Sequence, residues 1–103
     1  EVLLISDTEA NYCGGIMSSL RWEMLCTGVP FNEYRMSDIG EIDLSKYKLL
    51  IFSQPMLLTE EQLKNIQRKI SKDCQIMFCD LPGVCVEPFS LDRVFELTGM
   101  KVI

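Results

Sequence analysis

Three short apolar runs set the pattern of hydrophobic and polar positions along the chain. They occupy residues 2–6, 48–53 and 75–79, and turn or loop residues bound each of them. Runs of this length and composition are typical of strands that a parallel sheet buries on both faces. We therefore expect all three at the centre of one sheet. The run at 48–53, which Pro55 ends, predicts the most buried strand.

A first helix is predicted between the first two runs, over residues 16–27. Ile16, Leu20 and Met24 recur there at four-residue spacing, which places them on one helical face. Gly28 follows as a residue that commonly ends a helix. Trp22 lies off this stripe, so it is either a partly buried surface aromatic or a contact for another domain or subunit.

A second helix is predicted after the central strand, with a strong start signal. Thr59 can cap it, and Gln62 stands at the reciprocal position of a capping box. Leu58 and Leu63 are spaced to pack together across the helix start. The expected buried stripe consists of Leu63, Ile66 and Ile70, while Lys64, Gln67, Arg68 and Lys72 face water.

The remaining segments complete the pattern of elements. Residues 31–36 alternate in polarity and predict an edge strand, and the polar segment after them allows about one helical turn, near residues 43–45. Ser90 is expected to cap a last helix that Gly99 ends. The apolar face of that helix would combine Leu91, Val94 and Phe95, and residues 100–103 would form a final strand.

Strands and helices that alternate in this way predict an α/β fold. Right-handed crossovers favour a three-layer, flavodoxin-like sandwich, with a mostly parallel five-stranded sheet in the order 2-1-3-4-5 and helices on both faces. The length of 103 residues suits one domain covering residues 1–103. Because the chain begins and ends at strand-like residues, we expect it to be excised from a longer protein.

Charge and composition exclude several classes of function. The net charge is −5 and there is no basic run, which argues against binding nucleic acid or an anionic membrane surface. No apolar run reaches the length of a membrane span. The five cysteines form no CxxC pair and there is no histidine, so we expect no disulfide framework, no metal site and no cofactor. The missing histidine also removes Ser-His and Cys-His catalytic pairs.

A binding site in such a sheet would lie beyond the carboxyl ends of the strands. The candidate ligand-binding residues delivered there are Asp7, Asn11, Tyr12, Ser53, Gln54 and Asp80. Their polar groups could satisfy loop backbone atoms. Alternatively they could bind the hydroxyl groups of a small polar ligand or sugar, with Tyr12 stacking on it.

Several segments together carry a resemblance to a known family. They are TGVPF at 27–31, YKLLIF at 47–52, LLTEE at 57–61 with Leu63 and Ile66, QIMF at 75–78 and VFELTGMKV at 94–102. In this order they resemble the class I glutamine amidotransferase-like superfamily. The nearest match is its non-catalytic β-galactosidase trimerisation domain, found in glycoside hydrolase family 42 and related carbohydrate enzymes.

The chain departs from the active members of that superfamily at the catalytic position. Cys79 stands where the resemblance implies a nucleophile, but Phe78 and Asp80 replace small neighbours and no partner histidine exists. Asp80 should raise the pKa of the thiol and leave it a poor nucleophile. We therefore expect a degenerate site, with no glutaminase or esterase activity from this domain.

Three hypotheses about function follow. The first, implied by the resemblance, is a structural or assembly module of a larger enzyme, a glycoside hydrolase. Its partners would be the catalytic domain of the parent chain and neighbouring subunits, and its candidate contacts are Trp22, Tyr12 and Met56. The second is a module that binds a small polar ligand at the strand ends. The third is an enzyme that uses Cys79 or Cys13 with an unusual base.

Overall fold

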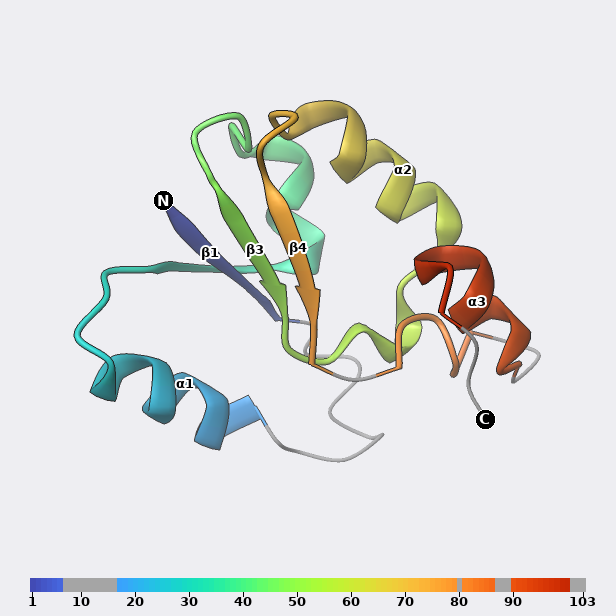
Figure 1. The fold of residues 1–103 in the computed structure, drawn as a ribbon, viewed down its shortest axis with the longest axis horizontal. Helices are drawn as coiled ribbons and strands as arrows, with labels where there is room; N and C mark the ends of the chain where they lie inside the picture. The colour runs from blue at the N-terminus through green and yellow to red at the C-terminus, as the bar shows by residue number, and fades with distance from the viewer. Residues whose placement is uncertain (7–16, 80, 87–89, 101–103) are drawn as a thin grey trace.

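The computed structural model describes residues 1–6, 17–79, 81–86 and 90–100. Within these residues the protein is an α/β fold with a four-stranded parallel sheet in the order β2-β1-β3-β4 (Figure 1). The strands are β1 (Val2–Ser6), β2 (Asn32–Arg35), β3 (Leu49–Phe52) and β4 (Gln75–Phe78). The helices are α1 (Met17–Cys26), α2 (Glu60–Lys69) and α3 (Asp92–Thr98), with 3₁₀ helices η2 (Met36–Glu41) and η3 (Pro55–Leu57).

The strand predicted to be central is central. β3 pairs in parallel with β1 on one side and with β4 on the other. Its register places Leu50 beside Leu3 and Ile76, and Ile51 beside Leu4 and Met77. Because successive side chains of a strand point to opposite faces, these two rows belong to the two faces of the sheet.

One face of the sheet carries the main hydrophobic core. Leu3, Leu50 and Phe52 pack there with residues of α2, η2 and the loop before β3. The buried members contributed by those segments are Ile39, Leu44, Tyr47, Leu63 and Ile66, and Leu58 joins them from the segment just before α2. The phenol oxygen of Tyr47 accepts a hydrogen bond from Asn32 Nδ2 at 2.7 Å, which ties the loop before β3 to β2.

Helix α2 begins at the capping box that the sequence predicts. Thr59 Oγ1 accepts a hydrogen bond from the Gln62 backbone N–H at 3.2 Å, and Gln62 Oε1 accepts one from the Thr59 backbone N–H at 3.0 Å. Leu63 and Ile66 are buried and Ile70 is half-buried, as expected for an amphipathic helix on a sheet. The two acceptors satisfy N–H groups that a helix start leaves without a partner.

The other face of the sheet is covered differently. Its central row runs from Glu33 of β2 through Leu4 and Ile51 to Met77 of β4. Leu4 and Ile51 are buried, whereas the Met77 side chain is 50% exposed. Helix α1 contacts this face through Arg21, which pairs with Glu33. Since α2 packs on the opposite face, helices lie on both faces, as predicted.

The position of β4 corrects the expectation that all three apolar runs would be central. Within the described residues β4 is an edge strand, and the described sheet has four strands rather than five. Met100 is not part of a strand, and residues 101–103 of the expected fifth strand lie outside the described residues. The apolar run predicted the strand correctly, but side-chain pattern alone did not determine its neighbours.

The crossover between β2 and β3 also differs from the prediction. The helical turn expected near residues 43–45 lies earlier, in η2, because Met36 and the buried Ile39 together pack against the core. Residues 43–45 instead form a side-chain turn. Asp43 Oδ1 accepts hydrogen bonds from the Ser45 backbone N–H at 3.0 Å and from Ser45 Oγ at 2.6 Å. These bonds hold the pKa of Asp43 below its usual value.

Helix α3 corrects two further expectations. It begins at Asp92, and Leu91 rather than Ser90 precedes it, without a side-chain cap. Val94 is buried against Met56 and Val84, while Leu91 and Phe95 are exposed. The helix is therefore rotated away from the predicted face, so that tertiary packing decides which side chains it buries. Its end is as predicted, since Gly99 adopts a left-handed φ of 76°.

Candidate functional site

The carboxyl ends of three strands meet at one edge of the sheet, as the sequence predicts. The Ser53 backbone N–H donates to the Ile5 carbonyl at 3.1 Å, and the Cys79 backbone N–H donates to the Phe52 carbonyl at 2.9 Å. These bonds continue the strand pairing one residue beyond β3 and β4. They bring the ends of β1, β3 and β4 side by side.

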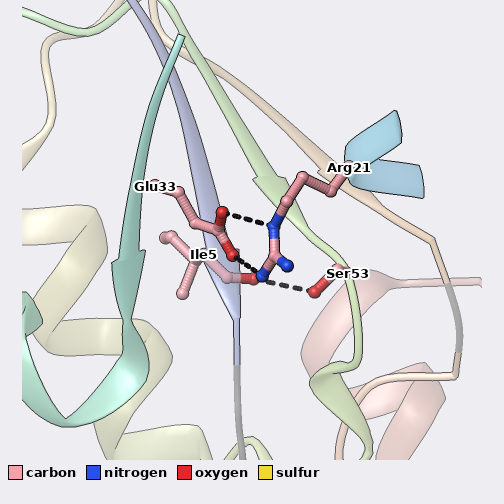
Figure 2. Close-up of polar contacts among 4 residues, drawn as sticks. All are labelled: Ile5, Arg21, Glu33 and Ser53. Atoms are coloured by element: carbon pink, nitrogen blue, oxygen red, sulfur yellow. Dashed lines mark hydrogen bonds and ion pairs between the residues drawn. The ribbon is translucent and has the colours of Figure 1, made fainter. Parts of the chain in front are cut away.

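Two of the six predicted ligand-binding residues are described, and both are buried. Ser53 Oγ donates to the Ile5 carbonyl at 3.2 Å (Figure 2), so this hydroxyl satisfies a backbone oxygen of the neighbouring strand. Gln54 is buried beside it in the chain. This contact fits the interpretation that strand-end side chains satisfy backbone groups. A ligand-binding role for Ser53 and Gln54 stays a prediction.

The other four predicted residues, Asp7, Asn11, Tyr12 and Asp80, lie outside the described residues. Cys79 is described and is exposed at the end of β4. Across the described part of the chain, no group of histidine, cysteine, aspartate or glutamate side chains could hold a metal ion. Away from this edge, burial raises the pKa of the half-buried Cys74 thiol, which donates to the Gln75 carbonyl.

A second candidate site lies on α1. Trp22 is 68% exposed, Leu25 57% and Val29 54%, and we call these three residues the α1 surface. Trp22 and Leu25 are three residues apart and therefore neighbours on the helix. Leu25 and Val29 line a hollow of about 530 Å³ whose other walls are Arg21, Gly28, Pro30, Phe31 and Glu33. Large apolar side chains are thus exposed together on one part of the molecule.

The sequence anticipated part of this surface. Of the three candidate contacts, Trp22 is exposed, so its role as a contact stays a prediction, and Tyr12 lies outside the described residues. The prediction of Met56 as a contact was wrong, because its side chain is buried against Val84 and Val94. Leu25 and Val29 were missed. The signal for Leu25 was its position off the stripe of Leu20 and Met24, whereas Val29 lies beyond the end of the helix.

An ion pair holds α1 against the sheet. Arg21 Nε donates to Glu33 Oε2 at 2.7 Å, and Arg21 Nη2 donates to Glu33 Oε1 at 2.5 Å (Figure 2). This two-pronged contact raises the pKa of Arg21 through the hydrogen bond and the charge of Glu33. The pair is partly exposed, so its contribution to stability is at most about 1 kcal/mol. The pair joins α1 to β2.

No protein-family model, curated protein or solved structure gives a significant match to the chain. No helix in the described ranges has the length and apolar character needed to cross a membrane.

Proposed function

We propose that the chain is a non-catalytic assembly module of a larger carbohydrate-active enzyme, similar to a β-galactosidase trimerisation domain. In this proposal its sheet is flavodoxin-like and gains a fifth strand beside β4. The module packs against a neighbouring copy of itself and against the catalytic domain of a parent glycoside hydrolase. The single observation that carries the proposal is the exposed α1 surface.

The α1 surface has the character of a protein contact rather than of a solvent face. None of the described side chains of α1, at residues 20–26, is buried, so the apolar side chains among these residues add little to the core. Tryptophan is among the residues enriched at the energetic centres of interfaces. Burying Trp22, Leu25 and Val29 against a partner would remove apolar area from water that folding alone leaves exposed.

The lack of histidine in the sequence favours an assembly role over cysteine-histidine catalysis. Cys79 has no histidine to activate it anywhere in the chain. A nucleophilic cysteine at neutral pH needs a cationic partner, a helix N-terminus or a base to lower its pKa.

Sedimentation equilibrium of the isolated chain tests the proposal. We expect a reversible association with a copy of itself that Trp22→Ser weakens by more than about tenfold, because interface tryptophans commonly contribute 2 kcal/mol or more. Phe95→Ser is the matched control. Phe95 is 54% exposed on α3, far from α1 in the fold (Figure 1), so its loss should leave the association unchanged.

A chain that stays monomeric up to millimolar concentration would contradict self-assembly. Equal weakening by Trp22→Ser and Phe95→Ser would also contradict it, because it would indicate unspecific contact between apolar residues. Circular dichroism of both variants checks that they fold, which their exposed positions lead us to expect.

A further inference from the structure

A groove between η2 and α2 has the size and floor of a small-molecule site. Its volume is about 390 Å³, within the range of ligand pockets. Met36, Ile39 and Ile66 contribute its apolar floor, with Ile39 and Ile66 themselves buried. It lies on the face of the sheet that α2 covers, opposite the face that α1 contacts. It is therefore separate from the α1 surface.

The rim of the groove is cationic. Arg68 and Lys69 line it together with the side-chain amides of Gln62 and Asn65. Lys69 Nζ donates to the Gly40 carbonyl at 2.9 Å across the groove, and Arg68 Nη1 donates to Asn65 Oδ1 at 3.3 Å. These bonds hold the two cationic groups at the rim.

No acid among the described residues forms an ion pair with these two cations. The ion pairs among the described residues join Arg21 to Glu33 and Lys64 to Glu60, and neither involves Arg68 or Lys69. The acids of η2, Asp38 and Glu41, do not line the groove. In a chain of net charge −5, a groove with two cations and no lining acid favours an anion over a cation or a neutral ligand.

We propose that this groove binds a small organic carboxylate with an aliphatic body. The carboxylate would accept hydrogen bonds from the guanidinium of Arg68 and the ammonium of Lys69, the side chains that suit it best. The aliphatic body would lie on Met36, Ile39 and Ile66. Gln62 and Asn65 have amide N–H groups that can donate to the same oxygens. Both parts of the ligand are needed, because charge pairing at an exposed rim is weak alone.

The ligand class is tested with hexanoate as the probe, by titrating it into the ¹⁵N-labelled chain and following amide shifts. Hexanoate should bind about tenfold more tightly than butyrate, because two more methylene groups reach the apolar floor. Hexanamide, which has the same body without the charge, should bind at least about fivefold more weakly than hexanoate. The shifts should centre on η2 and α2.

Charge variants test the residues. Arg68→Gln and Lys69→Gln should each weaken hexanoate binding about fivefold, since each removes one charge-assisted hydrogen bond at a partly exposed site. Lys72→Gln removes the same charge from an exposed position that does not line the groove, and should change binding by less than about twofold. Arg68→Gln leaves the bond from Lys69 to Gly40 in place, so it tests the site without loosening η2.

Three results would overturn the proposal. Hexanamide binding as tightly as hexanoate would exclude an anion site. Lys72→Gln weakening binding as much as Arg68→Gln would indicate diffuse charge attraction. Absence of amide shifts on η2 and α2 at millimolar hexanoate would exclude the groove as the place of binding.

Discussion

Among the glycines of the described residues, Gly83 leaves the least room for an added side chain. Its φ is +71°, a left-handed value that side chains disfavour. Its N–H donates to the Pro55 carbonyl at 2.8 Å, and its carbonyl accepts from Arg93 Nη1 at 2.9 Å. A Cβ here would lie 2.6 Å from Leu97 Cδ1 and 2.9 Å from the Leu58 carbonyl oxygen. The glycine therefore allows α3 to pack against the segment after β3.

Gly83→Ala should destabilise the protein by about 2–4 kcal/mol, from left-handed strain together with crowding against a backbone oxygen. Gly99→Ala is the control, because Gly99 has a similar φ of +76° but open space around it. Its cost should be about 1 kcal/mol, from the backbone conformation alone. Urea denaturation measures both. Equal losses in the two variants would show that the crowding at Gly83 has no energetic consequence.

At the scale of elements, α2 is the helix whose local signals and tertiary packing agree most fully. Thr59 and Gln62 satisfy each other's backbone N–H groups, and Leu63 and Ile66 enter the core. Glu60 at the helix start pairs with Lys64 at 2.8 Å, and the pairing lowers the pKa of Glu60. The carboxylate also lies at the positive end of the helix dipole.

Thr59→Ala should cost about 1 kcal/mol of unfolding free energy, because the Gln62 N–H loses its side-chain acceptor. Thr59→Ser keeps a hydroxyl at the same position and should stay within about 0.5 kcal/mol of the parent chain. The denaturation midpoints of the two variants give the comparison. If Thr59→Ala matched Thr59→Ser in stability, the capping box would not stabilise α2.

Local signals explain which elements could be predicted from the sequence. The capping box, the apolar run of β3 and the terminating Gly99 act within a few residues, so the sequence shows them directly. The edge position of β4 and the rotation of α3 depend on contacts with distant segments, which no short pattern contains.

The features of the candidate sites also differ in whether local signals in the sequence could predict them. The strand-end position of Ser53 followed from the topology, and the place of Trp22 at the surface followed from its position off the helical stripe, although it is more exposed than the partly buried aromatic considered there. The groove between η2 and α2 could not be predicted. Of its two cations the sequence pattern placed Arg68 on the solvent face but did not place Lys69, and it located the helical turn before β3 too late in the chain.

At the scale of the whole molecule, the two faces of the sheet have different coverings. The face under α2 and η2 is packed with the main core. On the other face, α1 contacts β2 through the ion pair of Arg21 with Glu33. The Met77 side chain of β4 is half-exposed on this face. The α1 surface therefore lies on the side of the sheet opposite the main core. It is the structural basis for proposing that a partner packs there.

The most direct test of this account is the solvent accessibility of Trp22, the single tryptophan of the chain, measured as a function of protein concentration. Acrylamide quenching of its fluorescence reports that accessibility without any substitution. We predict strong quenching at micromolar concentration, where the side chain is 68% exposed, and progressive protection towards millimolar concentration as copies associate through the α1 surface. Quenching that stays equally strong across this range, while sedimentation shows association, would contradict the account, because the copies would then meet elsewhere.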